Sequence, residues 1–140
     1  MTMRRYIPRW EAYGISPGRY DELRGFCIQY PEWKTEAASL LGVHGQALDG
    51  MPHGASAGDP VAAVAARRDG LLRKIQIIDD CAMSIEGGRW YAALIQNVCM
   101  KKPYASIDTL LLPTSNRNSF FAARKAFFLA LDKIKGGISD

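Results

Sequence analysis

The stretch that decides the fold is residues 110–132, LLLPTSNRNSFFAARKAFFLALD. Its apolar side chains recur at helical spacing, which predicts a helix over residues 116–135. The core-facing positions of that helix are Phe120, Phe127, Leu131 and Ile134, widened by Phe121 and Phe128. The Pro-Thr-Ser of residues 113–115 ends the preceding element and offers hydroxyls that cap the new helix. Two glycines at 136–137 close it.

Two more helices are predicted immediately upstream. Residues 89–100 carry apolar side chains at helical spacing, and the Lys-Lys-Pro of residues 101–103 breaks that helix. A short helix is then predicted from Tyr104 to Leu111. A medium helix, a short helix, a tight turn and a longer basic helix are typical of a helix-turn-helix unit, which we assign to residues 89–140.

The first turn of the last helix carries side chains that can read DNA. Arginine can pair with guanine and asparagine with adenine in the major groove, and a small alanine permits close approach. Lysines and hydroxyls before that helix would contact phosphates. The predicted DNA-binding residues are Lys101, Lys102, Tyr104, Ser106, Ser115, Asn116, Arg117, Asn118, Ser119, Ala122 and Lys125. The alternative is a three-helix bundle whose Asn, Arg and Ser residues are ordinary caps and surface groups.

The charge distribution also points to this segment. The chain of 140 residues has a formal net charge of +4, and residues 101–140 hold seven basic and three acidic side chains, so the whole excess lies there. A basic segment joined to a neutral remainder is typical of a protein with an anionic partner. A solvated surface that aids solubility explains the same charge equally well.

The remaining two thirds of the chain predict an all-α bundle. Residues 1–41 are expected to form an aromatic N-terminal arm and two short helices, the first opened by Ser16 and Pro17. Residues 42–58, rich in glycine, predict a flexible linker. Residues 59–88, opened by Asp59 and Pro60, predict one long central helix.

The long helix offers a second surface for association. It places apolar residues seven apart, at Val64, Leu71, Ile78 and Ile85. A stripe of this kind can mediate a homodimer, and it can equally be the centre around which a monomer wraps. The sequence leaves both interpretations open.

Composition places the chain among folded cytoplasmic proteins. It is 48% hydrophobic and 23% charged, and no apolar run approaches the roughly 20 residues that cross a bilayer. No signal-peptide pattern follows the basic N-terminus, so we expect no membrane partner. Three widely spaced cysteines, Cys27, Cys81 and Cys99, are expected to be reduced core residues.

No residue pattern indicates catalysis, a cofactor or a metal. There is no phosphate-binding loop of the Walker type and no nucleophile motif. His44 and His53 fall in the predicted linker, with only Asp49 between them as an oxygen ligand. Asp79 and Asp80 are adjacent, so on a helix they point apart, and we expect them to be solvated partners of neighbouring basic residues.

Three stretches resemble small phage and prophage regulators of Gram-positive bacteria. They are residues 110–132 quoted above, residues 20–34 (YDELRGFCIQYPEWK) and residues 74–80 (KIQIIDD). The C-terminal unit is also similar, more distantly, to the RinA and ArpU late-gene activators and to the promoter-reading region 4 of sigma factors. This resemblance implies a transcriptional regulator that binds double-stranded DNA with its final helix.

A different class of function also fits the sequence. The aromatic arm and the seven-residue repeat would serve a helical protein-interaction module, with RNA polymerase or a phage assembly component as partner. A small-terminase-like assembly role, also built on helix-turn-helix units, lies between the two classes.

Overall fold

The computed structural model describes residues 14–50 and 59–139, with side chains for 14–41 and 59–136. Its α-helices are α1 (Pro17–Ile28), α2 (Tyr30–Gly50), α3 (Pro60–Ser84), α4 (Tyr91–Leu94) and α5 (Arg117–Ser139). Shorter helical turns are η2 (Ile85–Gly88), η3 (Ile95–Cys99), η4 (Tyr104–Ser106) and η5 (Thr109–Leu111). The described residues contain no strand, which confirms the all-α class. The predicted N-terminal arm lies outside the described residues.

The starts of α1 and α3 are those that the sequence predicts, whereas the predicted helix over residues 89–100 is the short α4 followed by η3. Ser16 caps α1, its hydroxyl accepting from the Arg19 amide at 3.1 Å, and Pro17 occupies the first turn. Asp59 caps α3, its carboxylate accepting from the Val61 amide at 3.1 Å. Both caps satisfy amides that would otherwise lack a partner at a helix start.

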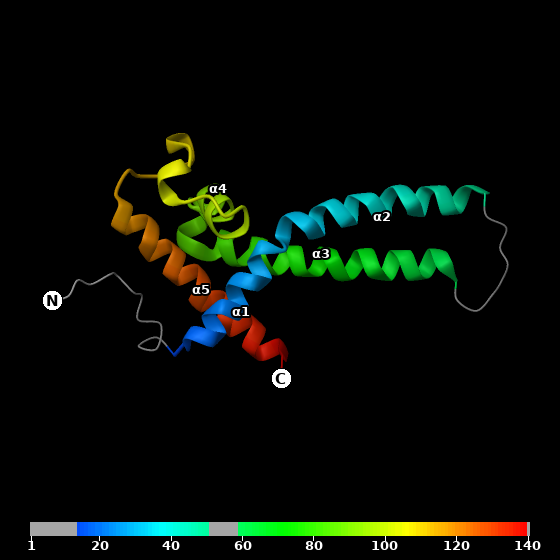
Figure 1. Ribbon diagram of the computed structural model, residues 1–140, viewed down its shortest axis with the longest axis horizontal. Helices are drawn as coiled ribbons and strands as arrows, with labels where there is room; N and C mark the ends of the chain where they lie inside the picture. Colours follow the sequence, from blue (N-terminus) through cyan, green and yellow to red (C-terminus); the bar gives the residue numbers. More distant parts are fainter. Residues whose placement is uncertain (1–13, 51–58, 140) are drawn as a thin grey trace.

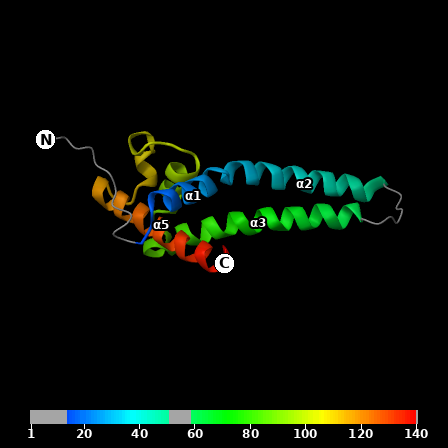
Figure 2. The same ribbon diagram turned by 60° about the horizontal axis from the view of Figure 1, so that its bottom comes forward.

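Helices α2 and α3 form a long antiparallel hairpin that projects from the rest of the molecule (Figures 1 and 2). Arg67 on α3 forms an ion pair with Glu36 on α2, and Arg68 donates to the Ala37 carbonyl at 3.0 Å. We call this pair of helices the hairpin arm. It carries the start of α3 away from α1 and α5.

The predicted linker boundary is wrong. Helix α2 continues through Gly50, so residues 42–50 are helical, and residues 51–58 lie outside the described residues. Helix propagation costs little once a first turn is packed, and each interior glycine opposes it by only about 1 kcal/mol. A helix that α3 accompanies can therefore continue through a glycine-rich stretch.

The longer α2 also changes the role of the apolar seam on α3. Leu71, Ile75 and Ile78 on that seam are buried within the chain, as is Ile85 just beyond it. The predicted dimer surface is therefore wrong along these residues, because α2 and the rest of the chain cover them. The burial of these residues favours the alternative of a chain that wraps around its central helix.

The chain reverses sharply after α3. Glu86, Gly87 and Gly88 have positive φ angles of 48°, 72° and 88°. The two glycines adopt such angles without strain, whereas a positive φ is uncommon for a residue with a side chain such as Glu86. A Cβ at Gly88 would come within 2.9 Å of the Met83 side chain. The Glu86 carboxylate accepts from the Trp90 indole at 3.1 Å and so holds the turn.

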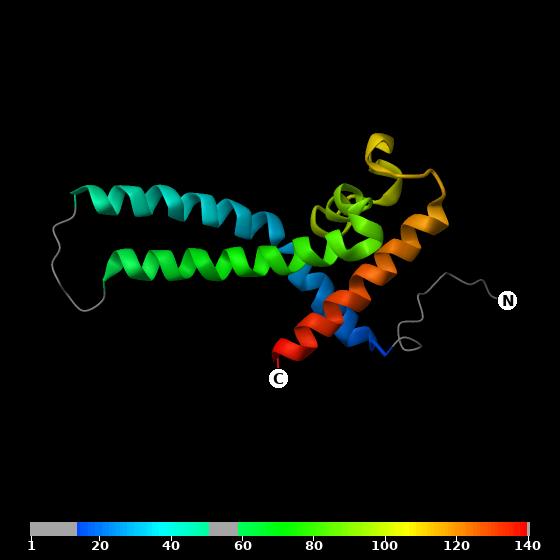
Figure 3. The same ribbon diagram turned by 180° about the vertical axis from the view of Figure 1, so that it is seen from behind.

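Helix α5 crosses α1 and supplies much of the core (Figure 3). Phe120, Phe127, Phe128 and Leu131 are fully buried, as predicted for the apolar face. Ile134, which the pattern placed on the same face, is 37% exposed. The crossing is fixed by Arg19, whose Nε donates to Asp132 Oδ1 at 2.7 Å.

Polar and thiol side chains occupy the junction of α1, α2, α3 and α4. Cys27, Cys81 and Cys99 are all buried and free of disulfides, as predicted. Asp79 is not a solvated partner of a basic residue. Its Oδ1 accepts from the hydroxyls of Tyr30 and Tyr91, each at 2.7 Å. Two long-range tyrosine hydroxyls therefore replace the local partners that sequence proximity suggested.

Candidate nucleic-acid interface

The Lys101–Lys102 loop leaves η3 at the edge of the helical body. Both lysines are exposed, and Lys101 has a φ of 63°. The side-chain amide of Asn97 donates to the Lys102 carbonyl at 2.9 Å and holds the loop in place. The loop therefore presents two cations to solvent from a backbone that is anchored to η3.

The predicted short helix from Tyr104 to Leu111 is not a continuous α-helix. It consists of the two 3₁₀ turns η4 and η5, separated by extended backbone at Ile107. Asp108 accepts from the Leu110 amide at 3.0 Å and starts η5 separately. A cap in the middle of the segment competes with a continuous helix, which explains the difference. The predicted second helix of the helix-turn-helix unit is therefore replaced by two short 3₁₀ turns.

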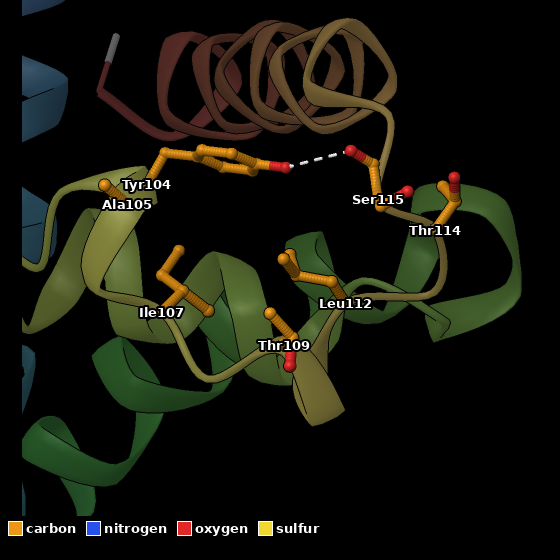
Figure 4. A pocket seen from close by; sticks show the side chains of 7 residues that line it. All are labelled: Tyr104, Ala105, Ile107, Thr109, Leu112, Thr114 and Ser115. Carbon is orange, nitrogen blue, oxygen red and sulfur yellow. Dashed lines mark hydrogen bonds between the residues drawn. The ribbon is translucent and has the colours of Figure 1, made fainter.

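A small cavity lies beneath this segment (Figure 4). Its volume is about 160 Å³, and its lining residues are Tyr104, Ala105, Ile107, Thr109, Leu112, Thr114 and Ser115. The Tyr104 hydroxyl donates to the Ser115 carbonyl at 3.4 Å across one side of it. Ligand pockets are usually about 300–1,000 Å³, so this cavity has the size of a packing gap and not of a substrate site.

Tyr104 supports the first turn of α5. Its ring lies 5.1 Å from the Phe120 ring and 5.8 Å from the Phe121 ring, centroid to centroid. The exposed Arg117 guanidinium lies 5.2 Å from the Tyr104 centroid and 5.0 Å from that of Phe121. Such cation–π contacts hold a guanidinium in place while leaving its N–H edge available. Tyr104 therefore positions Arg117 and is not a freely exposed phosphate contact.

Asn116 has a capping role that the sequence analysis did not assign. Its Oδ1 accepts from the backbone amides of Asn118 at 2.9 Å and Ser119 at 3.3 Å. Its own amide donates to Thr114 Oγ1 at 3.1 Å. An asparagine with this bonding starts the helix, so its carbonyl oxygen is occupied. Ser115, next to this start, is exposed and Ser119 is half-buried, while Ser106 in η4 is exposed.

One face of α5 remains open near its N-terminus. Asn118 and Ala122 are exposed and Lys125 is half-buried, and their spacing places all three on the same side of the helix. Their neighbours Phe120 and Phe127 point into the core. We call Asn118, Ala122 and Lys125 the open face. It combines an amide, a methyl group and a lysine side chain.

Arg124 and Asn97 belong to the same surface, although neither was predicted to. Arg124 Nε donates to Asn97 Oδ1 at 2.7 Å, and Asn97 in turn holds the Lys102 carbonyl. The spacing of seven from Arg117 to Arg124 was a signal that both lie on one side of α5. No local pattern indicated Asn97, because its partner lies 27 residues away.

Helix α1 adds a further arginine. Arg24 is exposed, and its guanidinium lies 6.0 Å from the centroid of the Tyr20 ring. Arg124 lies 5.9 Å from the same ring and 5.0 Å from the ring of Phe128. Two cations from helices distant in sequence thus approach one aromatic ring.

This end of the molecule is basic and poor in carboxylates. Residues 101–125 contain five basic side chains and one acidic side chain, Asp108, whose carboxylate caps η5. Among the predicted residues, Arg117 contacts Tyr104, Asn116 caps α5, and Lys102 is linked through Asn97 to Arg124 on α5. The arrangement suits an extended anion better than a small ligand.

No protein-family model, curated protein or solved structure matches this chain. Along residues 14–50 and 59–139, no helix combines the length and the apolar character that crossing a bilayer requires. In the same part of the chain, no three His, Cys, Asp or Glu side chains are grouped so that they could hold a metal ion. What the interface can do follows from its own chemistry.

Proposed function

We propose that the protein binds double-stranded DNA with the first turns of α5 and the Lys101–Lys102 loop. The observation that carries this proposal is the gathering of five cations and one occupied carboxylate at one end of the molecule, around an open helix face. Phosphate neutralisation by lysine and arginine supplies much of the affinity of DNA-binding proteins.

The open face supplies the chemistry for reading bases. The Asn118 amide can pair with the N6 and N7 edge of adenine, and the guanidinium of Arg117 with the O6 and N7 edge of guanine. Ala122 lets the helix approach the groove closely. The anchored loop contributes Lys101 and Lys102 to the phosphates on one side.

The resemblance to prophage regulators extends the proposal to transcription. In that role the bound duplex is a control site, and RNA polymerase is the protein partner. A homodimer on such a site would need a surface other than the buried seam of α3, which the chain itself covers.

The test begins with duplexes selected from a random library by the purified protein. Binding of a selected and a scrambled duplex is then measured by fluorescence anisotropy at several salt concentrations. Arg117→Ala and Asn118→Ala should each weaken the selected site by about 1–3 kcal/mol and blur the preference at single base positions. The double variant Lys101→Ala/Lys102→Ala should weaken both duplexes equally and lower the salt slope by about two.

Loss of folding should not be confused with loss of DNA binding in these variants. All these side chains are exposed, so the variants should keep the wild-type melting temperature, and loss of folding cannot imitate loss of binding. If wild-type protein binds neither duplex above background at low salt, the DNA proposal fails. The protein-interaction module then becomes the better function, and the hairpin arm, with Leu41 54% exposed, is its contact surface.

A further inference from the structure

We infer that Arg24 and Arg124, gathered around Tyr20, form a clamp for a backbone phosphate of the bound DNA. The clamp extends the interface from α5 onto α1, which the sequence analysis did not include. It rests on the proposed DNA binding, and it names a contact on that duplex beyond the open face and the lysine loop.

Arg24 and Arg124 differ from the nearby Arg19 in lacking an ion pair within the described residues. Arg19, which precedes Arg24 on α1, forms ion pairs with Asp132 at 2.7 Å and with Glu22 at 3.3 Å. Within the described ranges, neither Arg24 nor Arg124 has a carboxylate within ion-pair distance. The fold therefore neutralises one cation of the α1–α5 crossing and leaves two without an anion.

The geometry leaves the hydrogen-bonding edges of these guanidiniums available. Arg124 uses its Nε for Asn97, and its terminal nitrogens make no hydrogen bond to a described residue. A guanidinium over an aromatic ring is oriented by the ring, and its planar fork matches two oxygens of a phosphate. Two arginines beside one tyrosine ring can thus each donate to the DNA backbone.

The position of the clamp selects the DNA backbone over the bases. At about 100° per residue, Arg124 lies roughly 120° around α5 from Asn118 on the open face. It therefore faces α1 and the lysine loop, to which Asn97 joins it. Arg124 is also set back two turns, about 10 Å, from Arg117 at the helix start. When the first turn of α5 lies in a groove, a group set back in this way meets the flanking strand and not the base edges.

The decisive variant is Arg24→Ala, because Arg24 is exposed and, among the described residues, its guanidinium contacts the Tyr20 ring without a hydrogen bond or ion pair. Loss of one phosphate contact should lower the slope of log affinity against log salt by about 0.9. From that slope, the affinity at 0.1 M salt should fall about eightfold for selected and scrambled duplexes alike, and little at 1 M. Arg24→Lys keeps the charge and should recover most of the slope.

The matched control is Arg67→Ala, which removes the same side chain from the hairpin arm, away from α1 and α5 (Figure 1). It should leave the salt slope at the wild-type value. If wild-type protein and the Lys101→Ala/Lys102→Ala variant behave as proposed but Arg24→Ala matches the wild type, the clamp is wrong and the DNA proposal stands. If wild-type protein binds no DNA, both fall together.

Discussion

Arg124 Nε lies 2.7 Å from Asn97 Oδ1 and so joins α5 to η3, while the amide of Asn97 holds the Lys102 carbonyl at 2.9 Å. One asparagine thus sets the position of an arginine on the helix and of a lysine loop at the same time. The relative placement of the cations at this end of the molecule depends on a neutral side chain.

Asn97→Ala should therefore affect both stability and binding. It removes one hydrogen bond from a charged donor and one to a carbonyl, so the free energy of unfolding should fall by about 1–3 kcal/mol. The freed loop should also weaken binding of every duplex, because Lys102 must be ordered on association. Urea unfolding and anisotropy titrations measure the two effects.

Gln29→Ala is the matched control for that change. Its amide donates only to the Gly25 carbonyl within α1, at 3.0 Å on an exposed surface. Its removal should change stability by no more than about 0.5 kcal/mol and leave DNA binding unaltered. Equal effects of the two amide substitutions would show that Asn97 has no special role.

Alanine substitutions along the apolar face of α5 should lower the free energy of unfolding by very different amounts. Phe127 is fully buried, so Phe127→Ala should cost about 3–5 kcal/mol of unfolding free energy through lost burial and a cavity. Ile134 is 37% exposed, so Ile134→Ala should cost less than about 2 kcal/mol. Chemical denaturation of both variants gives the comparison, and a cost at Ile134 as large as that at Phe127 would contradict the position of the helix end.

Stability should also fall in mild alkali. Burial raises the pKa of the Cys81 thiol to about 12 from an ordinary 9.0, and a hydrogen bond with Cys27, then burial, raises that of Cys99. The unfolded chain releases these protons above about pH 9, whereas the folded chain keeps them. The protonated thiols therefore contribute fully to the free energy of unfolding below pH 9, and this contribution is lost as the pH rises toward 12. At pH 9.5 the loss is roughly 1 kcal/mol for each thiol.

The comparison of unfolding at pH 7.5 and pH 9.5 tests this dependence. Cys81→Ala should show a drop between the two pH values that is smaller than the wild-type drop by roughly 1 kcal/mol. Its absolute stability falls as well, because a small cavity opens, so the difference between the pH values is the readout. An identical drop in wild type and variant would rule out titration of Cys81.

Much of the local structure was predictable from the sequence. The caps at Ser16 and Asp59, the end of the long helix before Gly87 and the burial of Phe120 and Phe127 each follow from a few neighbouring residues. Caps, breakers and apolar periodicity act within one or two turns, so they are legible without knowledge of the fold. The exposure of Lys101, Lys102 and Arg117 was predictable for the same reason.

The contacts that build the interface were decided only by the tertiary structure. Arg24 and Arg124 both approach the Tyr20 ring because α1 crosses α5, and Asp79 accepts from Tyr30 and Tyr91 because three helices converge there. Likewise, α2 continues to Gly50 alongside α3 and covers the apolar seam of α3. The periodicity of α3 alone did not show whether α2 or a second chain covers that seam. A helical pattern determines which face of a helix is apolar, but the element that covers that face is chosen by packing among segments far apart in the chain.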